Sequence, residues 1–307
     1  MSRRQRGFVL VGVLFVLVLL SALAGGACFE ALQEMRLGRN AEQAVTLQAT
    51  AESGLTAALA AWDPRTNGTL AVGSVLRLPG AAPQGIAGSV DARRLSDRLL
   101  LLRSSATLAD GSSRTVARIA RLVGPEAAPA AVRARWVDPI VSARADGTDQ
   151  NPPLWSCPPT SGSAPGTLLQ PGASDSAFFR FGPMDWPALA AWAGAVPAGG
   201  DSLAVRYSAG DLTLSGGRVL GTLVVAGDLV LRSGVEVVGL VLVRGTLRLE
   251  AGGATVLGVV VASQVIVDQS VTPQQLTLGY SSCSATRAAL SRATPAPLRG
   301  VPLWGVF

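Results

Sequence analysis

The pattern of hydrophobic and polar positions divides the chain into segments of different period. Residues 8–29 carry no charge and are largely apolar, a length that suits one membrane-spanning helix. From Leu32 to Trp62, apolar residues recur mainly at steps of three and four, the period of an amphipathic helix, and Pro64 marks its end. We therefore expect one long helix over residues 8–62, with residues 8–29 as its transmembrane part.

Charges flank the apolar run unequally. Three arginines precede the run and two glutamates follow it: Arg3, Arg4, Arg6, Glu30 and Glu34. Because basic flanks stay on the cytoplasmic side of a membrane, this asymmetry places the N-terminus in the cytoplasm and the rest of the chain outside it. Gly25 and Gly26 weaken the helix most, so we expect a bend at this pair.

Residues 63–124 predict a small antiparallel sheet. The segments 99–108 and 114–123 have the composition of strands and are joined by Ala-Asp-Gly-Ser, which is a hairpin signal. Two more candidate strands precede them, at 69–78 and 85–90. We expect this sheet to pack on the outer half of the long helix.

Residues 125–200 form a connection that is rich in Pro, Gly, Ser and Ala. Asp185, followed by Trp and Pro, predicts a short helix with Asp185 as its N-cap. Four tryptophans lie in this segment, Trp136, Trp155, Trp186 and Trp192. Such residues commonly anchor loops on a core, and the alternative is a sugar-binding platform.

Residues 201–270 contain an internal repeat that predicts a parallel β-solenoid. Four apolar triplets begin at Leu212, Leu229, Leu247 and Val265, which are 17, 18 and 18 residues apart. One repeat cannot bury its own apolar side, so equivalent strands must stack, in about three to four coils. An antiparallel sandwich is the alternative, and the nearly equal periods argue against it. The expected fold class is therefore α+β, a long helix, a small antiparallel sheet and a solenoid head.

The last segment, residues 271–307, ends in an apolar sequence. We expect it to dock against the solenoid or to cap an open end, which would protect edge strands from pairing with other chains. Cys283 in this segment and Cys157 in the connection are candidates for a disulfide in an oxidising compartment. Cys28 lies in the apolar run and is expected to act as a small apolar residue.

Charge is concentrated in one region. The formal net charge is +6, and residues 91–135 contain nine Arg and four acidic residues. This basic patch is either a solvated sheet face or a surface for an acidic partner, such as another subunit or a phosphate backbone. Residues 201–268 carry five Arg and six acidic residues, which argues against nucleic acid on the solenoid.

Little in the sequence points to catalysis. The chain has no His, the commonest general base and metal ligand, and no nucleotide-binding or hydrolase motif. Asp211 and Asp228 should stack on one edge of the solenoid and are weak candidates for Ca²⁺ or acid–base chemistry. The next position in this stack is Thr246, so the stack contains only two carboxylates. Gly-Asp before a strand is also common in ordinary turns. We expect neither an enzyme nor a cofactor.

The N-terminus resembles a type IV prepilin leader. It reads Arg-Arg-Gln-Arg-Gly-Phe over residues 3–8, directly before the apolar run. The resemblance implies that a prepilin peptidase cuts after Gly7, at the end of a leader 1–7, and methylates Phe8. The alternative is a secretory signal cut near Ser21–Ala24, which would remove the apolar run.

The sequences Arg-Leu-Gly-Arg-Asn-Ala-Glu-Gln-Ala at 36–44 and Ala-Glu-Ser-Gly-Leu at 51–55 also resemble minor pilins of the PilX group. Major pilins carry Glu at the fifth residue after the cut, where it pairs with the N-terminal amine of a neighbour; here that residue is Gly12. The chain therefore resembles tip-capping subunits of the GspK type more closely than shaft pilins; the alternative is that Gly12 only packs a membrane helix.

This resemblance implies a minor pilin in the bacterial inner membrane, and later in the periplasm or a surface pilus. Its expected partners are the peptidase, other major and minor pilins, and the inner-membrane assembly platform. Two other functions remain open: an adhesin or DNA-uptake pilin, and a static membrane-anchored solenoid protein.

Overall fold

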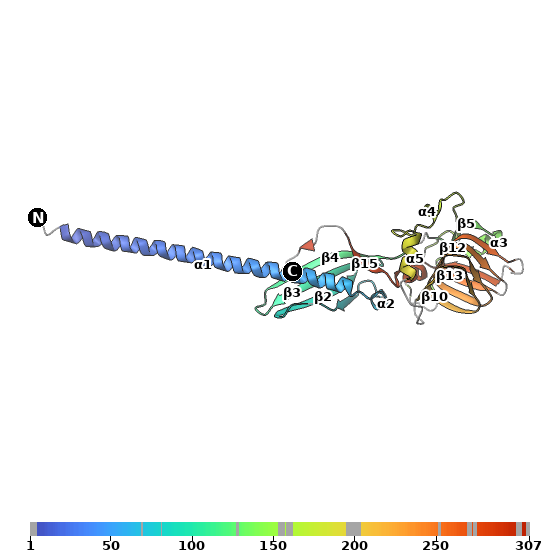
Figure 1. Ribbon diagram of the computed structural model, residues 1–307, viewed down its shortest axis with the longest axis horizontal. Coiled ribbons are helices and arrows are strands. Elements are labelled where there is room, and N and C mark those ends of the chain that lie inside the picture. The colour runs from blue at the N-terminus through green and yellow to red at the C-terminus, as the bar shows by residue number, and fades with distance from the viewer. Residues whose placement is uncertain are drawn as a thin grey trace.

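The computed structural model describes residues 5–68, 70–80, 82–126, 129–152, 157, 162–194, 204–250, 253–268, 272, 275–298 and 303–304. Three parts follow one another along its longest axis: a projecting helix, an antiparallel sheet at the end of that helix, and a solenoid (Figure 1).

Helix α1 runs over Gln5–Ala60 as one α-helix. The bend that we expected at Gly25 and Gly26 is not observed, and the ribbon passes through this region without a kink (Figure 1). Glycine lowers helix propensity but, unlike proline, removes no backbone donor, so the hydrogen-bond pattern can continue through the pair. A short helix, α2 (Pro64–Asn67), follows.

The antiparallel sheet forms where the hydrophobic pattern indicates, but the strand expected at 69–78 is confined to its last four residues, because a turn with Gly73 at φ 88° precedes it. It contains β1 (Val75–Leu78), β2 (Ile86–Arg94), β3 (Leu99–Leu108) and β4 (Ser113–Val123), each paired with the next. The predicted hairpin joins β3 to β4, with Gly111 at φ 89° and Asp110 accepting a hydrogen bond from the Ser112 backbone. One face packs on α1 through Leu47, Ala51 and Leu55, which recur at helical spacing and are buried.

The solenoid has about four turns. Its strands are β8 (Ala204–Ser208), β9 (Leu212–Leu214), β10 (Gly217–Val225), β11 (Leu229–Leu231), β12 (Val235–Leu249), β13 (Ala254–Val267) and β14 (Leu276–Tyr280). From β8 to β13, parallel pairing joins residues 17 to 19 positions apart, such as Leu212 with Leu229 and Val235 with Ala254, and β14 pairs with β13 at a spacing of 22, as in Ala254 with Leu276. Gly239, at φ 140°, occupies a corner where a Cβ atom would lie 2.0 Å from the Gly221 carbonyl oxygen. The repeat therefore corresponds to stacked coils and not to a sandwich.

The connection adds strands to the solenoid, which the sequence did not indicate. It contains β5 (Val132–Val137), α3 (Pro139–Arg144), β6 (Ala145–Asp146), β7 (Thr167–Leu169), α4 (Asp175–Phe178) and α5 (Trp186–Gly194). Strand β5 pairs with β13, β7 pairs with β5, and β6 pairs with β14, all in parallel. Val141 of α3 is buried in the solenoid core. The end of the solenoid formed by β13 and β14 is thus extended by strands that precede the solenoid in the chain.

The first part of the C-terminal segment docks on the solenoid as expected: β14 pairs with β13, and α6 (Ser282–Leu290) packs on the outside of the solenoid. Its last strands differ from our expectation, because β15 (Thr294–Pro297) and β16 (Leu303–Trp304) pair with β4 of the antiparallel sheet. The end of the segment therefore covers an edge of that sheet and not an open end of the solenoid. Strand β15 contains two prolines, which an edge strand tolerates because one side of it needs no donors.

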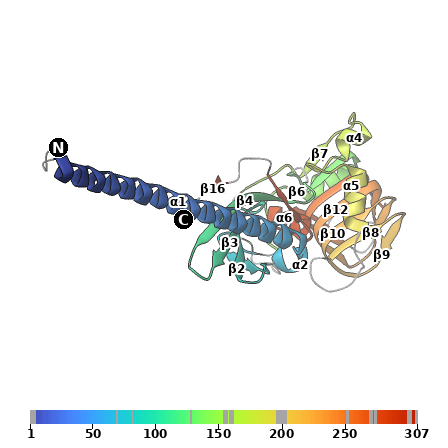
Figure 2. The same cartoon turned by 60° about the vertical axis from the view of Figure 1, so that its left-hand side comes forward.

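Helix α6 contributes to two cores, the one between α1 and the antiparallel sheet and the one on the outside of the solenoid. Its Ala288 and Ala289 pack with Val224 and Leu240 on the outside of the solenoid, whereas Leu290 belongs to the core between α1 and the sheet. Figure 2 shows α6 between the antiparallel sheet and the solenoid. The solenoid head is consequently packed onto the helix–sheet unit through a shared helix and not through a free linker.

Candidate functional site: the exposed helix and the solenoid head

The first half of α1 is an apolar surface that no other described residue covers. Every described side chain from Leu10 to Gln43 is exposed, and burial begins only at Ala44. The apolar window of this helix has a mean hydropathy of 2.5 and is 0% buried. So large an apolar surface needs lipid or other protein to cover it, and α1 is compatible with a single-pass membrane anchor.

The residues that the sequence pointed to at the N-terminus lie on this helix. Gly7 and Phe8 are within its first turns. Gly12 lies on the open surface, and a Cβ atom added to it would meet nothing within 4 Å. Packing inside the chain therefore does not explain the glycine at this position.

Asp211 and Asp228 have a structural role in the solenoid. Oδ1 of Asp211 accepts a hydrogen bond from the Asp228 backbone nitrogen at 2.8 Å, and Oδ1 of Asp228 accepts one from the Thr246 backbone nitrogen at 2.7 Å. A Cβ atom on Gly245 would lie 2.2 Å from Asp228 Oδ1, so the small residue makes room for the carboxylate. Each aspartate thus connects one coil to the next, and the described residues contain no cluster of three metal-ligating side chains.

Cys157 and Cys283 form a disulfide, with Cα atoms 6.0 Å apart and a separation of 126 positions in sequence. Cys283 belongs to α6, so the bond ties the connection to the helix that both cores share. Cys28 is a free, exposed cysteine of α1. The disulfide prediction is confirmed.

The basic patch at 91–135 is not one surface. Arg94 is buried and donates to the carbonyl oxygens of Gly68 and Leu70. Arg98 and Arg121 both form ion pairs with Glu126. Arg133 and Arg135 lie on β5, in the solenoid and away from the sheet. These five arginines therefore serve different parts of the structure and do not share one surface.

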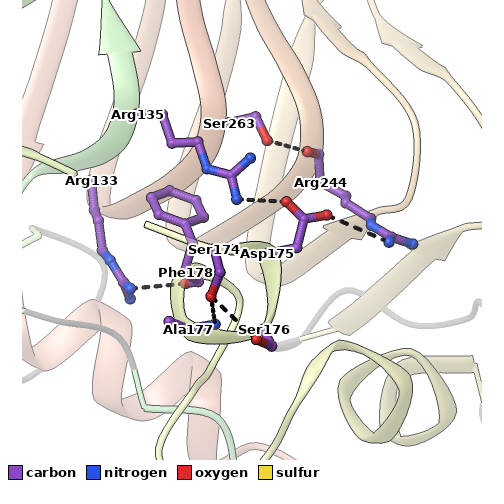
Figure 3. Close-up of polar contacts among 9 residues, drawn as sticks. All are labelled: Arg133, Arg135, Ser174, Asp175, Ser176, Ala177, Phe178, Arg244 and Ser263. Atoms are coloured by element: carbon purple, nitrogen blue, oxygen red, sulfur yellow. Dashed lines mark hydrogen bonds and ion pairs between the residues drawn. The ribbon is translucent and has the colours of Figure 1, made fainter. Parts of the chain in front are cut away.

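Two of these arginines hold α4 against the solenoid (Figure 3). Arg133 is buried and donates to the Phe178 carbonyl oxygen at 2.8 Å, and its guanidinium carbon lies 4.9 Å from the centre of the Phe178 ring. Arg135 lies 5.0 Å from the same ring and donates to Asp175 Oδ1 at 2.6 Å. The hydrogen bond from Arg135, helped by the charges of Arg135 and Arg244, lowers the pKa of Asp175.

Of the tryptophans of the connection, Trp186 and Trp192 anchor it on the folded chain, whereas Trp136 is exposed. Trp186 is buried with Phe179 and Phe181 against the outside of the solenoid, and Trp192 donates to the Arg292 carbonyl oxygen at 3.3 Å. Trp136 is 47% exposed on β5. Trp155 lies outside the described residues. Asp185 accepts a hydrogen bond from the Ala188 backbone nitrogen at 2.9 Å, as the predicted N-cap of α5 should.

Sequence reasoning missed the junction between the sheet and the solenoid. There α6 meets Arg98 and Glu126, and Trp62 at the end of α1 donates to the Ala293 carbonyl oxygen at 3.2 Å. These residues are far apart in sequence, and only the tertiary structure brings them together. The adjacent small residues of α6, Ala288 and Ala289, were the signal of close packing in the sequence.

Compared with protein-family models, curated proteins and solved structures, the chain gives no match in any of the three. The geometry and the prepilin-like N-terminus are therefore the basis for any statement about function.

Proposed function

We propose that the chain is a minor type IV pilin that primes or caps assembly of a pilus or pseudopilus and displays a β-solenoid head. One observation carries the proposal. A leader-like sequence ending at Gly7 precedes a single helix whose first half is exposed and apolar and whose second half is covered by an antiparallel sheet. Such a helix can lie in a membrane before assembly and among other helices afterwards.

Gly12 supports a position at the end of a fibre. The resemblance to pilins implies that a carboxylate at this position pairs with the terminal amine of a neighbouring subunit. Gly12 has no side chain to make that pair. An amine buried without a partner costs free energy, so a subunit lacking the carboxylate suits the tip or the start of a fibre better than its shaft.

The head supports the same position. It is joined to the helix–sheet unit through α6, β15 and β16, so it must accompany the helix wherever the helix packs. A solenoid fixed in this way would have to be accommodated by every neighbour along a shaft, whereas at a tip it projects freely. The proposed role is structural and needs no catalytic residue or cofactor.

The proposal places the chain first in the bacterial inner membrane, with its N-terminus in the cytoplasm, and later in the periplasm or on the cell surface. The partners are a prepilin peptidase, other pilins and an inner-membrane assembly platform.

Substitution of the leader glycine tests the proposal. Gly7→Asp should leave a longer, uncut chain and abolish its incorporation into fibres, as measured by immunoblotting of membranes and sheared fibres. Ala24→Leu is the matched control, because it blocks only a secretory cleavage and should leave processing unchanged. Normal processing of Gly7→Asp together with loss of processing in Ala24→Leu would refute the proposal.

A further inference from the structure

A row of side chains runs along one corner of the solenoid and ends at Trp136. Thr246 of β12 pairs with Gln264 of β13, and Gln264 pairs with Trp136 of β5. Asp228 lies one coil before Thr246 and accepts a hydrogen bond from its backbone nitrogen at 2.7 Å. Because paired positions of neighbouring strands present their side chains on the same side of a sheet, these four residues form one line, which we call the corner row.

Trp136 is open to solvent at the end of the corner row. Of the tryptophans whose side chains the structure describes, it alone is exposed, at 47%. Among the described residues, its indole nitrogen has no hydrogen-bond partner, and the exposed amide of Gln264 has none either. An indole offers one donor, and an amide offers two donors and an acceptor oxygen. The corner row therefore presents an aromatic ring next to unused donors and acceptors.

The charges around the corner row cancel. Three arginines and three aspartates belong to the row, lie within two residues of it or pair with such a residue: Arg135, Arg244, Arg248, Asp138, Asp175 and Asp228. Arg135 and Arg244 both pair with Asp175, and Asp138 accepts a hydrogen bond from the Ile140 backbone nitrogen as the N-cap of α3. Since neither sign is in excess, the attraction that dominates binding of a phosphate backbone is weak here, and an uncharged ligand suits the row better.

The spacing and the place of the corner row suit a long ligand. Neighbouring strands lie about 4.8 Å apart, so the three steps from Asp228 to Trp136 span roughly 14 Å. One step is close to the length of one pyranose unit in an extended polysaccharide, so successive units can meet successive coils. Strand β5, which carries Trp136, lies toward the end of the molecule opposite the N-terminus (Figure 1).

We propose that the corner row binds a neutral polysaccharide whose pyranose units are linked equatorially. The C–H groups of such a unit form an apolar face, which would stack on the indole ring of Trp136. Hydroxyls of the next units would form hydrogen bonds with the side chains of Gln264 and Thr246. The backbone pairing of the coils fixes these side chains in line before binding, which lowers the entropic cost of association. This inference concerns the head alone and does not depend on cleavage after Gly7.

Isothermal titration calorimetry tests this proposal on the full-length chain, in a detergent whose head group is not a sugar and so cannot compete. The probes are cellohexaose, glucose and an oligothymidylate. Cellohexaose should bind saturably, and glucose at least about tenfold more weakly, because a single unit meets only one step of the row. The oligothymidylate should bind more weakly than cellohexaose, because the row has no excess positive charge.

Three variants locate the site. Trp136→Ala removes the ring and should weaken cellohexaose binding by at least about tenfold, whereas Trp136→Phe keeps a ring and should retain most of the affinity. Tyr207→Ala is the matched control and should leave the Kd unchanged, because it removes a 38% exposed aromatic side chain from β8, at the other end of the stack of coils. The proposal is overturned if cellohexaose does not bind saturably, if Trp136→Ala binds it like Tyr207→Ala, or if the oligothymidylate binds more tightly than cellohexaose.

Discussion

Oδ1 of Asp228 lies 2.7 Å from the backbone nitrogen of Thr246, which occupies the equivalent position one coil later in the solenoid. Asp211 makes the same contact with the backbone nitrogen of Asp228 at 2.8 Å. The side chains at these turns therefore continue the hydrogen bonding between coils where the strands are interrupted. This relationship explains the repeated Gly-Asp without any catalytic or metal-binding role.

Replacing Asp228 should weaken the contact between two coils. We expect Asp228→Ala to lower the free energy of unfolding of the head by about 1 kcal/mol, because the Thr246 backbone donor loses its protein acceptor at an exposed site. Asp228→Asn keeps an oxygen in place and should recover most of the loss. Urea unfolding followed by circular dichroism measures both. Equal stability of the alanine variant and the native chain would show that the contact is incidental.

The disulfide should be the strongest local contribution to the stability of the head. Cys283→Ser opens a loop of 126 residues, and the chain-entropy description gives a loss of up to about 4–5 kcal/mol. A reductant should have the same effect on the native chain. Cys28→Ser is the control, since Cys28 is exposed on α1 and free. Differential scanning calorimetry with and without reductant measures the change; an unchanged Tm for Cys283→Ser would contradict this role.

Tyr280 should make the junction sensitive to alkali. Burial, and then the negative charge of Asp149, raises the pKa of Tyr280 above its ordinary value of 10.0. The folded chain therefore holds the phenol proton more tightly than the unfolded chain, so its contribution to stability is complete below pH 10.0 and is lost as the pH rises through the folded-state pKa. Between about pH 9 and pH 11, the native chain should lose more stability than Tyr280→Phe. Parallel losses in the two proteins would exclude this effect.

The solenoid could be predicted because its determinants repeat. The triplets that begin at Leu212, Leu229 and Leu247 fall at nearly equal spacing, and the stacked pairing of the structure follows that spacing. The antiparallel sheet could be predicted from the sequence for a different reason. Its β3–β4 hairpin depends on neighbouring residues, with Asp110 and Gly111 in the turn.

The remaining parts depend on contacts between distant residues. Strand β5 lacks the Gly-Asp turn of the repeat and precedes β13 by more than a hundred residues, so nothing in its own sequence shows that it extends the solenoid. Strand β15 contains Pro295 and Pro297, which argue against a strand unless its edge position is known. The junction of the sheet and the solenoid was hidden for the same reason, since its residues come together only in the folded chain.

The most direct test of the account is the intact mass and the N-terminal peptide mass of the protein isolated from its native membrane. We predict a chain that begins at N-methylated Phe8. A chain that begins at Met1 or Ser2 would indicate a static membrane anchor, and one that begins just after Ala24 would indicate a secreted protein. Either of these results would contradict the proposal that the chain is a pilin.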